Sequence, residues 1–234
     1  MRRLNVLVIG LLLAAPALGA QPATARTAVG VRLGELVFAQ ATALKPTPFI
    51  GLEAAWQLPW SPARRRADAP SFGIGVSLDV SRPRTDGAQF PLAAVDRGDT
   101  TYLYAMAQRV TLVQSGVQAQ IGVPLAGARV IGYAGGGWYA MLLGSRASGG
   151  SRRLIHPMAS FGLAVDDPLT RTLSVRVQVG GTTYVQFNRS ALDATRSLPE
   201  EQRIRDAAPA PAPAPRTPTN LQYSVMLRFT PGGV

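Results

Sequence analysis

The stretch Asn220-Leu221-Gln222-Tyr223-Ser224-Val225-Met226-Leu227-Arg228-Phe229 decides how this chain folds. Side chains in a β-strand point to opposite faces at successive positions. One face of this strand therefore carries the apolar and aromatic residues Leu221, Tyr223, Val225, Leu227 and Phe229. The other face carries Gln222, Ser224, Met226 and Arg228. An apolar face with aromatic residues toward both ends, opposite a polar face, is typical of a strand between lipid and a polar lumen.

Seven further segments show the same alternation, so the sequence predicts eight strands in all. They cover residues 27–38, 47–60, 71–82, 110–125, 128–143, 154–165 and 170–187. In the first segment Glu35 interrupts the apolar series, and a bulge there would bring Leu36 and Phe38 to the lipid side. The segment 128–143 is apolar on both faces, which leaves its register open.

Connection lengths alternate between short and long, as they do in a small outer-membrane barrel with both termini and the short turns in the periplasm. Residues 124–128 and 166–169 read as tight turns, whereas 83–109 and 188–218 are long loops. Residues 61–70 are rather long for a periplasmic turn. The first interpretation is an all-β fold, a closed antiparallel up-and-down transmembrane β-barrel of eight strands over residues 27–230. A ten-stranded barrel, which would use the alternating segment 100–108, is the second.

The N-terminus has the features of a secretory signal peptide over residues 1–20: Arg2 and Arg3, an apolar run and small residues at the end. Residues 21–26 would lead into the barrel, and 231–234 form a tail. The chain has no cysteine, so it has neither a disulfide nor a lipid-attachment thiol. Loss of the two arginines lowers the net charge from +11 to +9. No basic helix or RNA-binding signature accompanies this charge, which favours anionic lipid over nucleic acid as its counterpart.

Five charged residues fall on the inward faces of the predicted strands: Arg32, Glu53, Asp79, Arg176 and Arg228. An eight-stranded barrel is just filled by its inward side chains. Charges there must be paired, because an isolated ion away from water is costly. Since the first strand adjoins both the second and the last in a closed barrel, four of them can form a ladder around the lumen: Arg32, Glu53, Asp79 and Arg228. We expect a structural role for them rather than proton or ion conduction.

The sequence indicates no catalytic residue, no cofactor and no metal site. His156 is the sole histidine, and without cysteine the usual transition-metal clusters are excluded. His156 and Ser160 both point inward, but they lie about 13 Å apart along a strand, too far for a base to activate a nucleophile. The Gly135-Gly136-Gly137 run precedes no helix, so it does not form a phosphate cradle.

The loop 188–218 has two parts. Residues 197–200 resemble a helix start, and the alternating Ala-Pro segment 208–215 favours polyproline II. The loop is either a flexible solvated connection or a recognition arm. The two long loops should face outward, and several of their arginines can reach anionic headgroup phosphates. These arginines are Arg84, Arg97, Arg109, Arg189, Arg196, Arg203, Arg205 and Arg216.

The last strand resembles the C-terminal targeting signal of bacterial outer-membrane barrels. The resemblance lies in Gln222, Ser224 where that family usually has glycine, Leu227 and Phe229, with five residues following. The mature chain resembles OmpA-type and OmpX-type small outer-membrane barrels over nearly its full length. That resemblance implies a monomeric protein of the bacterial outer membrane, inserted by the barrel-assembly machinery. It implies contact with lipid and lipopolysaccharide, and a role in envelope stability, adhesion or binding of an extracellular surface or protein through the loops. A lipid A-modifying enzyme, a narrow solute channel and a secreted lipocalin-like barrel remain alternatives.

Replacement of Phe229 by aspartate is expected to block assembly. The last strand has both to signal insertion and to close the barrel, and a charge on its lipid face opposes both. Outer-membrane levels of a Phe229→Asp protein, measured by immunoblot of washed membranes, should fall well below those of a Phe229→Tyr control. Equal levels of the two proteins would contradict the assembly-signal hypothesis.

Overall fold

The computed structural model describes residues 27–58, 61–64, 68–86, 92–97, 100–105, 108–144, 151–192 and 217–231. Several sequence-based predictions lie outside these residues. They are the signal peptide at 1–20, the leader at 21–26, the helix start at 197–200, the proline-rich segment 208–215 and the tail after residue 231.

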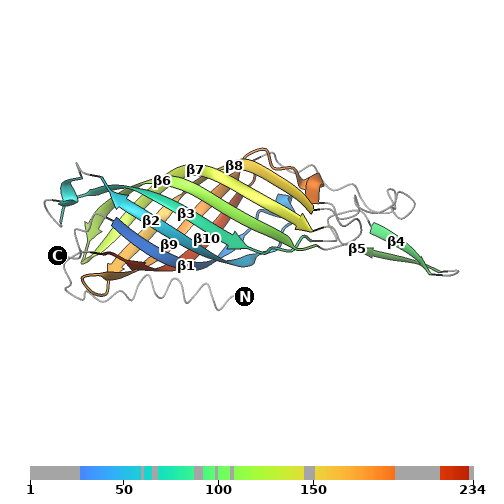
Figure 1. The fold of residues 1–234 in the computed structure, drawn as a ribbon, viewed down its shortest axis with the longest axis horizontal. Helices are drawn as coiled ribbons and strands as arrows, with labels where there is room; N and C mark the ends of the chain where they lie inside the picture. The colour runs from blue at the N-terminus through green and yellow to red at the C-terminus, as the bar shows by residue number, and fades with distance from the viewer. Residues whose placement is uncertain are drawn as a thin grey trace.

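Eight antiparallel strands close into a barrel, which confirms the predicted fold (Figure 1). The strands are β1 (Thr27–Val37), β2 (Thr47–Gln57), β3 (Ser71–Ser81), β6 (Val110–Leu125), β7 (Ala128–Gly144), β8 (Ser151–Pro168), β9 (Leu173–Tyr184) and β10 (Thr219–Phe229). Their order around the barrel is β1-β10-β9-β8-β7-β6-β3-β2. The first and last strands close the barrel with a register that runs from Val29 opposite Phe229 to Val37 opposite Leu221.

The ten-strand interpretation is wrong. β4 (Leu92–Arg97) and β5 (Thr100–Ala105) pair with each other in a separate two-stranded sheet. This hairpin extends beyond the barrel at the right of Figure 1. β3 pairs directly with β6, from Ser71 opposite Gly122 to Ser81 opposite Leu112, so no strand is inserted between them. The alternation of residues 100–105 therefore belongs to the hairpin.

The two ends of the barrel differ in their connections. At one end, which we call the turn end, two short connections join β6 to β7 and β8 to β9, and Thr27 and Phe229 lie there too. Ala126 and Gly127 both have positive φ, as a two-residue hairpin turn requires. At the opposite end, which we call the loop end, β3 ends and β6 begins, and β9 ends and β10 begins, so the long connections 83–109 and 188–218 start and finish there. The short connection from β1 to β2, with the 3-10 helix η1 (Gln40–Thr42), is also there.

The outer surface of the strands is apolar. Residues with substantial exposure include Leu33, Leu52, Val117, Trp138, Phe161 and Leu227. In β10 the predicted faces hold, because Leu227 and Phe229 are 52% and 48% exposed whereas Ser224 and Met226 are buried. A closed barrel satisfies its backbone groups internally, and an apolar exterior suits lipid contact. The fold is therefore a transmembrane β-barrel with its polar faces inside.

Helices contribute little to the described part of the chain. Among the described residues, no helix is long and apolar enough to cross a membrane.

Two predicted orientations were wrong. β1 has no bulge at Glu35, because Glu35 stays in register with both Tyr223 and Pro48. Leu36 and Phe38 are consequently buried inside the barrel rather than facing lipid. The predicted strand 170–187 ends at Tyr184 instead. Gln186 has positive φ and redirects the chain, so Phe187 is buried rather than on the lipid side.

The register of β7 is now defined. Tyr139, Met141 and Leu143 are buried inside, and Trp138 is on the outer surface. Gly135 faces inward where β6 passes very close: a Cβ atom there would lie 2.0 Å from the Val117 carbonyl oxygen and 2.6 Å from Gln118 Cα. Glycine therefore permits the close approach of the two strands at this position.

We expect Gly135→Ala to lower the free energy of unfolding by roughly 1–3 kcal/mol, the usual cost of overpacking. Gly132→Ala is the matched control on the same strand, since a Cβ there would have its nearest neighbour, Leu163 Cδ2, 4.0 Å away. Urea unfolding in lipid vesicles, followed by the gel shift between folded and unfolded barrel, measures both. Equal stability of the two variants would contradict the close-approach argument.

Candidate functional site

Arg32 and Asp79 meet in the barrel interior, and both are almost fully buried. Arg32 Nε donates to Asp79 Oδ1 at 2.6 Å, and Arg32 Nη2 pairs with Asp79 Oδ2. The two residues lie on β1 and β3, on either side of β2, where Gly51 pairs with both. A Cβ at Gly51 would lie 1.8 Å from Asp79 Oδ1. The missing side chain therefore leaves the space in which this ion pair forms.

Glu53 connects that pair to the opposite wall of the lumen. Its Oε1 accepts from Arg176 Nη1 at 2.7 Å and from Gln120 Nε2 at 3.2 Å. Its Oε2 lies 3.7 Å from Arg32 Nη1 and accepts from Gln118 Nε2 at 3.4 Å. One carboxylate thus links β1, β2, β6 and β9 through charged and amide side chains.

Asp166 completes the ion network, and the sequence analysis missed it. Its Oδ2 accepts from Arg176 Nη2 at 3.0 Å and also pairs with Arg228 Nη1. Its Oδ1 accepts from Ser174 Oγ at 3.1 Å. The Asp-Asp-Pro sequence was interpreted as a turn, but β8 continues to Pro168. His156 and Ser160 are inward-facing positions of the same strand, and continuing this alternation to position 166 would have predicted an inward Asp166.

The structure thus brings all five predicted inward charges into one network with Asp166. Arg32 contacts Asp79 and Glu53, Arg176 joins Glu53 to Asp166, and Arg228 contacts Asp166. The predicted ladder placed Arg228 beside Arg32. Arg228 is instead connected to it through Asp166, Arg176 and Glu53. The network role of these charges in fixing register stays a prediction.

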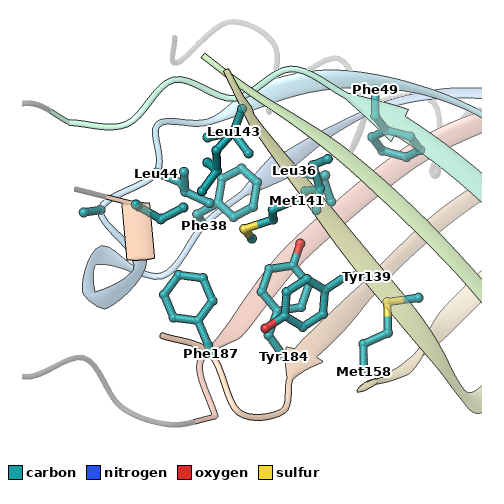
Figure 2. Close-up of a cluster of buried hydrophobic side chains, with 14 residues drawn as sticks. Leu36, Phe38, Leu44, Phe49, Tyr139, Met141, Leu143, Met158, Tyr184 and Phe187 are labelled. Atoms are coloured by element: carbon teal, nitrogen blue, oxygen red, sulfur yellow. The ribbon is translucent and has the colours of Figure 1, made fainter. Parts of the chain in front are cut away.

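Apolar side chains fill the lumen at the loop end (Figure 2). We call this group the apolar plug; its members are Leu36, Phe38, Ala43, Leu44, Phe49, Val110, Leu112, Tyr139, Met141, Leu143, Met158, Tyr184, Phe187 and Leu192. The rings of Tyr139 and Tyr184 stack with centroids 4.2 Å apart. Tyr184 OH accepts from Gln114 Nε2 at 3.2 Å, where the plug meets the polar interior.

Loop residues contribute to the plug and cover the barrel mouth. Phe38 and Leu44 come from the connection between β1 and β2. Phe187 follows β9, and Leu192 belongs to the 3-10 helix η4 (Arg189–Leu192). Gln108 Nε2 donates to the Leu192 carbonyl oxygen at 2.6 Å and so connects the two long loops. Among the described residues, apolar side chains from the strands and the loops therefore close this end of the lumen.

His156 lies beside the plug and not in a catalytic arrangement. Its ring centroid is 5.7 Å from that of Tyr139. Neither Ser160 nor any carboxylate among the described residues hydrogen-bonds to it. In the same part of the chain, no group of three or more His, Asp or Glu side chains could hold a metal ion.

The four residues of the predicted assembly signal divide between the two faces of β10. Gln222 and Ser224 are buried in the lumen, and Gln222 Oε1 accepts from Thr182 Oγ1 at 3.3 Å. Leu227 and Phe229 lie on the outer surface. Their role in targeting stays a prediction.

The loop arginines do not all face outward. Arg84 and Arg109 are exposed, but Arg189 is buried, because η4 folds back over the barrel mouth. Arg189 therefore does not face outward as its place in the loop predicts, and headgroup contact stays a prediction for the other loop arginines. Arg196, Arg203, Arg205 and Arg216 lie outside the described residues, as does the side chain of Arg97.

No protein-family profile matches the sequence, and no curated protein does. Solved structures of small outer-membrane barrels are similar to the chain. Neisserial surface protein A has a TM-score of 0.49 at 6% identity, covering 87% of this chain and 96% of that one. Ail, the attachment invasion locus protein of Yersinia pestis, has 0.42 at 7%, covering 88% and 99%. The N-terminal barrel domain of Pseudomonas aeruginosa OprF has 0.37 at 12%, covering 88% and 98%.

A double-mutant cycle on Arg32 and Asp79 tests the structural role of the network. Either Arg32→Met or Asp79→Leu leaves a buried charge without its main partner, which we expect to cost about 3–5 kcal/mol. The double variant removes both charges, so its loss should be smaller than the sum of the two by about 2 kcal/mol or more. Urea unfolding in lipid vesicles provides all three values. Additive losses would show that the pair does not act as a unit.

Proposed function

We propose that the protein is a non-catalytic barrel of the bacterial outer membrane, which stabilises the envelope and interacts with its surroundings through the loop end. The observation that carries this proposal is a lumen sealed by the apolar plug and crossed by the ion network, inside a barrel with an apolar exterior. Because the plug fills the lumen at the loop end and the network crosses its middle, we place interaction at the ends of the barrel.

The alternatives fit the geometry less well. A narrow channel would need a continuous water path, but Tyr139 and Tyr184 stack within the plug. A barrel enzyme would need His156 to contact a nucleophile or a carboxylate, and among the described residues it has neither. A secreted lipocalin-like barrel would need its apolar faces inside, whereas here residues such as Leu33 and Leu163 are more than half exposed.

The proposed orientation follows the connections. The turn end, where the first strand of the barrel begins and the last strand ends, would face the periplasm. The loop end would face outward. Export by a cleaved signal peptide and insertion by the barrel-assembly machinery are parts of this proposal, as is action as a monomer. The loops 83–109 and 188–218 would then be available to an extracellular surface or a protein ligand.

Basic residues surround part of the loop end. We call Lys45, Arg82, Arg84 and Arg109 the basic rim; all four are exposed. Arg84 and Arg109 lie opposite each other at an isolated antiparallel bridge. Like charges in this arrangement are unfavourable. The only acid paired with the rim among the described residues is Asp86, 3.9 Å from Lys45, and both of these side chains are solvent-accessible.

An anionic ligand would relieve this repulsion. Lipopolysaccharide carries phosphates at the level of the outer headgroups, and arginine binds phosphate through paired hydrogen bonds. The basic rim therefore supports lipopolysaccharide as the lipid partner of the loop end.

Replacement of Arg84 and Arg109 together by glutamine should weaken binding of fluorescent lipopolysaccharide to the refolded barrel roughly thirtyfold, since each basic residue near an anionic surface contributes about 1 kcal/mol. Fluorescence anisotropy in zwitterionic detergent measures the affinity. Replacement of the same two residues by lysine, Arg84→Lys with Arg109→Lys, retains both charges and is the matched control. An equal loss in the control, or no loss in the glutamine variant, would contradict the proposed role of the rim.

A further inference from the structure

A cavity of about 130 Å³ occupies the turn end of the lumen, opposite the apolar plug. Its volume is several times the space that one water molecule needs. The lining includes the connection between β8 and β9, where Thr170 and Arg171 are exposed, so the cavity adjoins solvent. It also includes inward residues near the ends of β6, β7, β9 and β10.

Positive charge dominates this cavity. Arg129, Arg171, Arg176 and Arg228 line it, whereas Asp166 is the only carboxylate among its lining residues. Asp68 and Asp167 lie at the same end of the barrel but do not line the cavity. The buried acids are already shared: Asp166 pairs with Arg176 and Arg228, and Glu53 pairs with Arg176 and Arg32.

The charges of the ion network alone balance, because three arginines face three carboxylates. Arg171, which also lines the cavity, is additional to it. The network and Arg171 together therefore carry one positive charge in excess at the turn end. A water-accessible concave site with an excess of one charge concentrates ions of opposite sign.

Hydrogen-bond donors are also left over. Arg176 is 2% exposed, and its Nε atom is buried without a partner, although its two terminal nitrogens are bonded. A buried donor on a charged group without an acceptor is unfavourable and indicates a missing partner. Arg228 bonds to Asp166 through Nη1, and a guanidinium carries five N–H donors in all.

We propose that this cavity is a binding site for one oxyanion group, a carboxylate or a phosphate, held by Arg171 and Arg228 beside Arg129. Planar guanidinium groups bind both kinds of oxyanion through paired hydrogen bonds. The hydroxyls of Ser174 and Thr172 lie in the same wall and add uncharged donors. The volume suits the anionic group of a molecule entering from the turn end, whereas the apolar plug closes the route from the loop end.

The test uses the whole mature barrel, labelled with ¹⁵N, in zwitterionic detergent. Inorganic phosphate and acetyl-alanine are titrated separately against chloride at equal ionic strength. Saturable shifts are expected at the amides of Thr172, Leu173 and Arg228. Saturation by phosphate alone would support a phosphate ligand, by acetyl-alanine alone a carboxylate ligand, and by both a general oxyanion site. Saturation by neither would overturn the proposal.

Single substitutions test whether the oxyanion binds in the turn-end cavity. Arg171→Gln and Arg228→Gln should each weaken it roughly tenfold, as loss of a charge-assisted hydrogen bond does. Arg153→Gln, an equal charge change at the loop end, should leave the affinity unchanged. The gel shift of the folded barrel shows whether Arg228→Gln still folds; if it does not, Arg171→Gln decides, since Arg171 is exposed and belongs to no ion pair of the network. Unchanged affinity in Arg171→Gln, or equal weakening by Arg153→Gln, would overturn the assignment.

Discussion

Closure of the strand ladder is the constraint on which the rest of this structure depends. A β-sheet in lipid has to satisfy its backbone groups within the protein, and pairing of β1 with β10 removes the last open edges. Once the ladder is closed, strict alternation assigns one face of each strand to lipid and the other to the lumen. Charged side chains on the inner face are then shielded from water, so they have to form ion pairs with one another. The buried network around Glu53 follows from closure in this sense.

The lumen is filled in two different ways along the barrel axis. Toward the loop end the lumen is filled by apolar side chains, which need no partners and exclude water. In the middle it is filled by arginines, carboxylates and glutamines that satisfy one another across the barrel. Gln114 marks the boundary, with its amide bonded to the hydroxyl of Tyr184. An interior of this kind suits the structural role that we propose, in which interaction is left to the two ends of the barrel.

Alternation was sufficient to predict the eight strands and the inward position of the five charges, because lipid on one side and a polar lumen on the other impose a period of two. It could not predict which charges meet. The Arg32–Asp79 pair depends on register and on the missing side chain of Gly51 between them. The apolar character of a residue also could not predict its orientation where both the lipid side and the lumen are apolar. Phe38 and Phe187 would fit lipid as well as they fit the plug, in which they are buried. The hairpin of β4 and β5 alternates like a barrel strand, and only the pairing separates the two.

The distribution of charge along the barrel axis indicates where function can reside. The central network is balanced, so it adds no net charge that would attract a ligand, in keeping with the structural role predicted for it. The basic rim at the loop end and the arginine-lined cavity at the turn end are where positive charge is in excess among the described residues. Excess charge destabilises a fold unless a counter-charge is bound. Since the apolar plug and the ion network occupy the lumen between these two sites, we propose that each end recognises anions from its own side of the membrane.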